Sequence, residues 1–149
     1  MRVKKVLFIA ALLFFSFNLP AQTVKTGAEL TEAYLPLIRG KRVAVMTNQT
    51  GRVGDEHLVD LLIRNKVDLV GIFSPEHGFR GTADAGEHVA SSMDEKTGVP
   101  VWSLYGGGGG KPSADKMRMF DVLLFDLQDV GLRFYTYYAS MARLMDACA

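Results

Sequence analysis

The sequence is poor in cysteine, in net charge and in histidine, and each shortage excludes a class of protein. Its single cysteine, Cys148, rules out a disulfide framework within the chain. A formal net charge of +1 gives no electrostatic basis for binding nucleic acid. The three histidines, His57, His77 and His88, are too scattered to indicate a metal site, and the sequence indicates no cofactor.

The N-terminus carries the pattern of a secretory signal peptide. Arg2, Lys4 and Lys5 precede an apolar stretch over residues 6–17, and a processing site follows at Ala21. Because that stretch is too short for a comfortable membrane span, an uncleaved anchor is the weaker alternative. We therefore expect residues 1–21 to be removed and the mature protein to be periplasmic or secreted, without membrane contact.

The remaining residues, 22–149, are enough for one modest domain. The last stretch, residues 134–149, has helical periodicity but stops without a glycine cap, a polar tail or a following strand. We therefore expect this sequence to be the N-terminal piece of a longer protein.

Four apolar runs predict strands, at residues 42–47, 69–73, 100–105 and 122–127. The runs are continuous rather than alternating, and helical stretches separate them. This combination is typical of a parallel sheet that is covered on both faces. The expected fold class is therefore α/β: a Rossmann-like parallel sheet with helices on both faces and right-handed crossovers, truncated at the C-terminus.

The helices are predicted from their caps and their periodicity. A capping box of Thr26 and Glu29 opens the first helix, which ends near residue 38, and Asp55 is expected to cap the second. A short third helix is predicted over residues 112–120. The last helix is expected to start near Arg133 and to place four apolar residues on one side: Phe134, Tyr137, Met141 and Leu144.

Polar side chains follow each predicted strand. The carboxyl ends of parallel strands open on one edge of a sheet, where ligands bind. The period of two along a strand also places Asp126 and Gln128 on the same side. We therefore expect one cleft that is lined by Asn48, Glu76, His77, Tyr105, Asp126, Gln128 and Asp129.

The most informative segment is S-P-E-H-G-F-R-G, residues 74–81, which is followed by Glu87. Two carboxylates can act as acid and base, or as acid and nucleophile, on an acetal. Partial desolvation beside Phe73 and Phe79 favours the neutral acid form of Glu76. Glu87 and Asp126 are the candidates for the second carboxylate, although Asp126 can instead bind backbone amides and Glu87 can instead pair with Arg80.

Other side chains suit the binding of an acidic sugar. Arg80 and Arg133 can clamp a carboxylate through paired hydrogen bonds. Tyr105, Tyr135 and Trp102 can stack on a sugar face, although Trp102 lies in a predicted strand and fits the core better. The alternative for His77 is a role in orienting Glu76.

The five-glycine run, residues 106–110, follows the third predicted strand rather than the first. No acidic residue stands where a dinucleotide-binding motif would place one, so a nucleotide site has little support. The run indicates a flexible loop, and a lid over the cleft is one use for it.

Six blocks of sequence resemble one known family, the secreted bacterial exo-β-N-acetylmuramidases. They are T-N-Q-T-G (47–51), S-P-E-H-G-F-R-G (74–81), D-A-G-E (84–87), D-E-K-T-G-V-P-V (94–101), S-L-Y-G (103–106) and D-V-L-L-F-D-L-Q-D-V-G-L-R-F-Y-T-Y (121–137). The resemblance runs from about Gly40 to Ala149. It departs from the family pattern in the five-glycine run and in its length.

The resemblance implies an activity, a domain plan and a catalytic residue. Such enzymes release N-acetylmuramic acid from the non-reducing ends of peptidoglycan fragments, so the expected partners are muramyl saccharides. A Rossmann-like catalytic domain precedes a smaller C-terminal domain in this family, which makes residues 22–149 the N-terminal part of the catalytic domain. The family's catalytic glutamate falls on Glu76. The lactyl carboxylate of muramic acid gives Arg80 or Arg133 a partner.

Two other functions stay open at this point. One is a noncatalytic peptidoglycan- or sugar-binding module on the same Rossmann-like scaffold, since a fold alone does not fix a function. The other is a nucleotide-dependent enzyme that uses the glycine run. Release of a chromophore from a muramic acid glycoside separates the first of these from a glycosidase.

Overall fold

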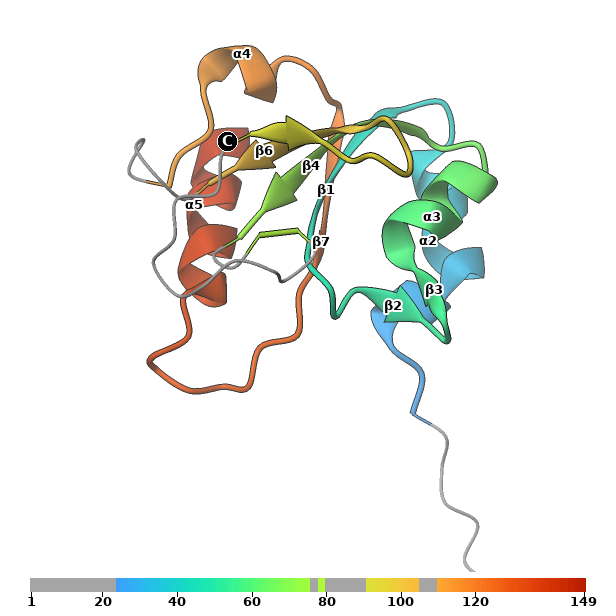
Figure 1. Cartoon of the computed structure of the whole chain (residues 1–149), viewed down its shortest axis with the longest axis horizontal. Coiled ribbons are helices and arrows are strands. Elements are labelled where there is room, and N and C mark those ends of the chain that lie inside the picture. Colours follow the sequence, from blue (N-terminus) through green and yellow to red (C-terminus); the bar gives the residue numbers. More distant parts are fainter. Residues whose placement is uncertain (1–23, 76–77, 80–90, 105–109) are drawn as a thin grey trace, which may run out of the picture.

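A five-stranded sheet forms the centre of the molecule, in the order β5-β6-β4-β1-β7 (Figure 1). The computed structural model describes residues 24–75, 78–79, 91–104 and 110–149. The strands are β1 (Arg42–Thr47), β4 (Asp68–Ser74), β5 (Ser92–Met93), β6 (Pro100–Ser103) and β7 (Val122–Asp126). Strands β6, β4, β1 and β7 are parallel, and only the two-residue β5 pairs antiparallel, with β6.

Helices cover both faces of this sheet. Helices α2 (Thr31–Ile38) and α3 (Leu58–Arg64) lie on one side, and α4 (Ala114–Met117) and α5 (Tyr137–Cys148) on the other (Figure 1). Strand β1 contributes to the core on both faces of the sheet. Val43 and Val45 pack on the face of α3, and Ala44 and Met46 pack on the face of α5. The predicted α/β fold with two covered faces is confirmed.

The strand predictions match the structure to within two residues, but several helix starts were wrong. The Thr26–Glu29 capping box is present, yet it opens a single 3-10 turn, η1 (Gly27–Glu29), and α2 begins separately at Thr31. Asp55 caps no helix. It lies instead in the turn of a small hairpin between β2 (Arg52–Val53) and β3 (Glu56–His57).

The C-terminal helix also begins later than predicted, at Tyr137 rather than Arg133. Of the four apolar residues expected on its inner side, Tyr137 and Leu144 are buried. Phe134 precedes the helix and is 93% exposed, and Met141 is exposed as well. The predicted third helix, residues 112–120, shrinks to the four residues of α4, which Ser113 caps.

Trp102 belongs to the core, as its strand position indicated. It is 6% exposed, and its ring meets the ring of Phe73 edge to face, with the centroids 5.0 Å apart. The neighbouring strand makes room for it at Gly71, where an added Cβ would lie 2.3 Å from the indole ring.

An ion pair fixes β7 beside β1 at the amino ends of both strands. Arg42 Nη2 lies 2.7 Å from Asp121 Oδ1, and the Arg42 amide donates to Asp121 Oδ2 at 2.9 Å. Hydrogen bonds from the side chain and the backbone of Arg42 lower the pKa of Asp121 to about 2. This end of the sheet is opposite the edge where the sequence predicts the site.

Candidate active site

Asn48 is the first residue after β1 and is 1% exposed. Its side-chain oxygen accepts hydrogen bonds from the amide of Thr50 at 2.9 Å and from the Thr50 hydroxyl at 2.7 Å. Its side-chain nitrogen donates to the Tyr137 hydroxyl at 3.2 Å. Both ends of this buried amide therefore have hydrogen-bond partners, as a buried polar group requires. Through the bond to Tyr137, Asn48 connects the loop after β1 to the start of α5.

His57 is the N-cap residue of α3, contacts the loop after β1 and is 5% exposed. Its Nδ1 accepts a hydrogen bond from the Val59 amide at 3.2 Å, and its Nε2 lies 2.8 Å from the carbonyl oxygen of Asn48. Because Nδ1 accepts, the geometry assigns the proton to Nε2, which donates to that carbonyl. Phe79 meets the imidazole edge to face, with ring centroids 5.0 Å apart.

Hydrogen bonds fix the chain at the carboxyl end of β4, where the S-P-E-H-G-F-R-G segment begins. Ser74 and Pro75 are fully buried, and the Ser74 carbonyl accepts a hydrogen bond from the Leu104 amide at 3.1 Å. The Gly78 amide donates to the Pro75 carbonyl, also at 3.1 Å. Five predicted site residues lie outside the described residues: Glu76, His77, Arg80, Glu87 and Tyr105.

Asp126 is the last residue of β7 and pairs in register with Thr47. It lines a cavity of about 200 Å³ on the α2 and α3 side of the sheet, together with Tyr34 and Leu58. Its Oδ2 is buried and has no hydrogen-bond partner within the described part of the chain. Burial raises the pKa of Asp126.

The Asp126→Asn substitution is expected to stabilise the fold at neutral pH. A raised folded-state pKa means that the stability from this group is present at low pH and is lost as the pH rises through that pKa. Removing the charge should therefore raise the free energy of unfolding at pH 7 by roughly 1 kcal/mol or less, because asparagine keeps the polar shape of aspartate but has no charge to desolvate.

Urea unfolding of the two proteins at pH 7 and at about pH 3, below the ordinary pKa of aspartate, measures this effect. The difference should vanish at the lower pH. A variant that is less stable than the wild type at pH 7 would show instead that the carboxylate is satisfied in the fold.

The other predicted residues of this region lie on the loop between β7 and α5. The backbone amide of Gln128 donates a hydrogen bond to the Thr50 hydroxyl at 3.3 Å, and this bond connects the loop to the end of β1. Asp129 is exposed and accepts a bond from the Gly131 amide at 2.7 Å. Arg133 is exposed, and Tyr135 is 41% exposed with its ring edge to face with Tyr137.

Asn48, Gln128 and Tyr135 thus lie near one another at the strand ends. Thr50 bonds to both Asn48 and Gln128, and Tyr137 contacts both Asn48 and Tyr135. Asp126 stands at a neighbouring strand end, but its side chain lies on the opposite face of the sheet from the Asn48–Tyr137 contact. Asp126 and Gln128 were predicted to share one side of a strand. Strand β7 ends at Asp126, so Gln128 lies beyond the strand and its alternation does not apply there.

Three residues at this edge were missed by the reasoning from sequence: Thr50, His57 and Tyr137. Asn48 and Thr50 have the spacing of an Asx turn, in which the asparagine side-chain oxygen accepts a hydrogen bond from the backbone amide two residues later. This spacing could have identified Thr50 from the sequence. His57 directly precedes an apolar helical run, which is the position of a cap. The partner of Tyr137 is 89 residues away, and no local pattern shows it.

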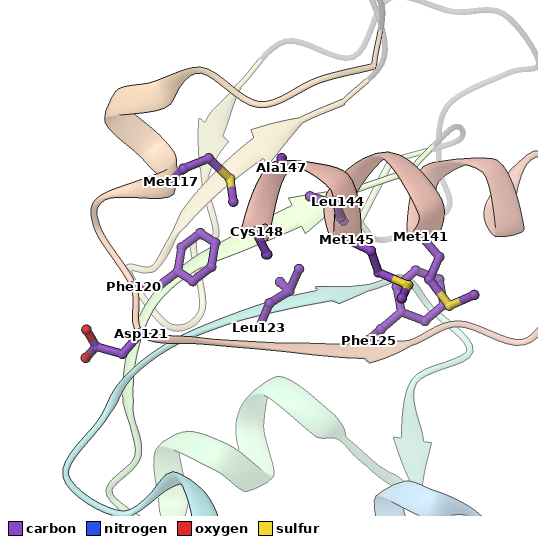
Figure 2. A pocket seen from close by; sticks show the side chains of 10 residues that line it. All are labelled: Met117, Phe120, Asp121, Leu123, Phe125, Met141, Leu144, Met145, Ala147 and Cys148. Atoms are coloured by element: carbon purple, nitrogen blue, oxygen red, sulfur yellow. The ribbon is translucent and has the colours of Figure 1, made fainter.

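A second cavity, of about 490 Å³, is not at this edge. It lies between α5 and β7, where Met141, Leu144 and Met145 face Leu123 and Phe125 (Figure 2). Its lining includes one charged side chain, Asp121, which is already engaged by Arg42. A sugar site needs convergent polar groups, so this apolar cavity does not provide one.

Within the described residues, no three histidine, cysteine, aspartate or glutamate side chains gather closely enough to hold a metal ion. The helices found in that same part of the chain are all too short or too polar to cross a bilayer.

Comparison with known proteins gives one family and several relatives. The family model described as the exo-beta-N-acetylmuramidase NamZ, N-terminal, matches residues 43–149. The peptidoglycan beta-N-acetylmuramidase NamZ of Bacillus subtilis (strain 168) is 46% identical over 127 residues. That alignment covers 83% of this chain and 30% of the relative, so the chain spans about a third of the relative's length.

Two solved structures share the fold, and both are DUF1343 family proteins of Bacteroides fragilis NCTC 9343. One is 54% identical with a TM-score of 0.70, over 83% of this chain and 31% of its own. The other is 38% identical with a TM-score of 0.76, over 87% and 33% respectively.

Proposed function

The chain belongs to the family of the N-terminal region of the exo-beta-N-acetylmuramidase NamZ, and from this membership we propose that it forms part of a peptidoglycan glycosidase. The proposed reaction is exo-acting hydrolysis that releases N-acetylmuramic acid from the non-reducing ends of peptidoglycan fragments. The observation that carries the proposal is the match over residues 43–149, which includes both the T-N-Q-T-G and the S-P-E-H-G-F-R-G blocks.

The proposed catalytic acid is Glu76, and the second carboxylate is Glu87 or Asp126. Burial raises the pKa of Asp126 and so favours its protonated form, whereas a second carboxylate that acts as base or nucleophile must be ionised, so this observation counts against Asp126 in that role. Asn48 is not free to turn toward a ligand, since both ends of its amide are bonded within the fold. We therefore assign to Asn48 the support of the site rather than direct contact with the sugar.

Substrate recognition is proposed for Arg80, Arg133 and Tyr135, and also for His77, Tyr105, Gln128 and Asp129. Arg133 and Tyr135 are exposed on the loop that follows β7, so both can reach a ligand above the strand ends. A guanidinium group matches the lactyl carboxylate of muramic acid. We further propose that the protein is exported through the signal sequence at residues 1–21 and that it acts on muramyl saccharides in the periplasm or outside the cell.

A pair of chromogenic substrates tests the proposed function on the complete gene product that contains this chain. The 4-nitrophenyl β-glycosides of N-acetylmuramic acid and N-acetylglucosamine differ only in the lactyl group. We expect kcat/KM for the muramic acid glycoside to be higher by roughly 10²-fold or more, because a site built around a charged group discriminates against its absence.

Release of chromophore from neither glycoside, together with measurable binding of muramyl saccharides, would favour the noncatalytic binding module instead. Equal rates on both glycosides would leave a glycosidase but would remove the proposed role of the lactyl carboxylate.

A further inference from the structure

Strand β7 lies at the edge of the sheet, although its composition is that of an inner strand. Residues 122–125 read V-L-L-F, and all four remain partly exposed. Strand β1, which has a partner on each side, is buried from its second residue onward. No described residue pairs with the outer side of β7, so the backbone groups on that side are a template for a further strand.

Helix α5 carries an apolar stripe next to the face that it packs on the sheet. Leu144 lies on the packed face and is 1% exposed. Met141, Met145 and Cys148 follow at spacings of four and three residues, which places them together on the adjoining face. All three are exposed, and they line the 490 Å³ cavity with side chains of β7 (Figure 2). The apolar stripe and the edge of β7 therefore form one continuous surface.

Helix α5 runs antiparallel to β7 and leads the chain back to the start of that strand (Figure 2). Its first residue, Tyr137, bonds to Asn48 at the carboxyl end of the sheet. Its last residue, Cys148, lines the cavity with Asp121, which directly precedes β7. The 12 residues of the helix rise about 18 Å and the 5 residues of the strand about 17 Å, so the helix spans the strand once. Cys148 therefore lies at the level where a strand parallel to β7 would begin.

Topology decides on which side of β7 such a strand would lie. Across the sheet, the parallel strands β6, β4, β1 and β7 are the third, second, first and fourth in chain order. This is the start of the doubly wound order, in which the fifth strand lies beside the fourth. Helix α5 also lies on the same face as α4, whose crossover runs from β6 toward β7 (Figure 1). A right-handed crossover through α5 therefore continues in that direction, to the outer side of β7.

We propose that the surface formed by β7 and the apolar stripe of α5 is covered, in the complete gene product, by a further strand parallel to β7 that the chain beyond Ala149 supplies. This chain spans about a third of the length of its muramidase relative, so a gene product of similar length has ample sequence for it. The carboxyl end of that strand lies beside Asp126, at the edge that carries the candidate site. The inference goes beyond the proposed function and does not depend on it, because it concerns the sheet and not the reaction.

Oxidation of methionine by hydrogen peroxide in the complete gene product tests whether the stripe is covered. Met145 is 63% exposed in this structure, and Met93 and Met119, which lie outside the cavity, are 58% and 43% exposed. We expect Met145 to react at least about 10-fold more slowly in the folded than in the urea-unfolded protein, whereas Met93 and Met119 should change less than about 3-fold. Mass spectrometry of peptides measures the rates. Equal rates for Met145 in both states would overturn the proposal.

Hydrogen exchange tests the strand itself. Along an edge strand, amides bonded to the neighbouring strand alternate with amides open to water, whereas all amides of an inner strand are bonded. We expect the amides of residues 122–126 all to exchange at least about 100-fold more slowly than in an unfolded chain. Alternating slow and fast amides would show that no strand pairs there. Both measurements are repeated on diluted protein, since protection that is lost on dilution would assign the surface to a second copy instead.

Met145→Glu and Met119→Glu are matched variants that place a carboxylate inside and outside the surface. A carboxylate at position 145 would be buried under the further strand, so Tm of the complete gene product should fall by about 5 °C or more. Met119→Glu should change Tm by less than about 2 °C, as expected for an exposed position. Equal shifts would contradict the proposal, and the two measurements on the wild type decide it if Met145→Glu does not fold. A protein that releases no sugar would remove the proposed function and leave these results unaffected.

Discussion

Replacing Glu76 by Gln is expected to lower kcat on the muramic acid glycoside by about 10²- to 10⁴-fold, the usual contribution of general acid catalysis. Glutamine has nearly the shape of glutamate, but it cannot donate a proton to the leaving oxygen or take one back. The affinity for a muramyl saccharide should stay within a few-fold of the wild type. Initial rates and calorimetric titration of the complete gene product measure the two quantities separately.

The same assay identifies the second carboxylate. Glu87→Gln and Asp126→Asn serve as parallel variants, and the one that carries the second role should lose activity to a comparable extent. Asp126→Asn is informative in either case, because its expected gain in stability excludes unfolding as the cause of a lost rate. If Glu76→Gln works at close to the wild-type rate, the assignment of Glu76 is wrong.

Replacing Gly71 by Ala is expected to destabilise the fold by about 3 kcal/mol, the upper part of the range for overpacking a core. The new Cβ would lie 2.3, 2.4 and 2.5 Å from three atoms of the Trp102 ring. The ring has little freedom to move away, because it is 6% exposed and rests against Phe73. Denaturation in urea measures the loss.

Gly27→Ala is the matched control, because nothing lies within 4 Å of a Cβ at that position. It should be neutral or slightly stabilising. The smaller ring of Trp102→Phe should relieve part of the strain, so the double mutant should show a coupling energy of about 1 kcal/mol or more. A loss in Gly71→Ala no larger than that in the control would mean that the sheet and the indole adjust freely.

The sheet was predictable from the sequence for a simple reason. Strands β1 and β4 are apolar on both faces, so each appears as an unbroken run of apolar residues that no surface helix would show. Trp102 was assigned to the core because it stands in such a run. The helix starts were less predictable. Asp55 is a residue type that commonly caps helices, but the pairing of β2 with β3 places it in a hairpin turn instead.

The candidate site was predictable only as an edge of the sheet. Parallel strands place Asn48, Ser74 and Asp126 at their carboxyl ends, and the structure has them there. The face on which each side chain lies depends on where each strand stops and on partners far away in the sequence. Asn48 meets Tyr137 across 89 residues, and no periodicity of either segment contains that information.

Strand β1 lies between β4 and β7 in the sheet, and its two partners come from very different distances along the chain. Its partner on one side, β4, follows after a single helix, whereas β7 arrives on the other side only when the chain has run on to Asp121, 79 positions beyond Arg42. The entropy of closing so long a loop must be offset before that pairing gains anything. We therefore expect β1 to pair with β4 before it pairs with β7, so this five-stranded sheet is completed by a strand from about the last fifth of this sequence.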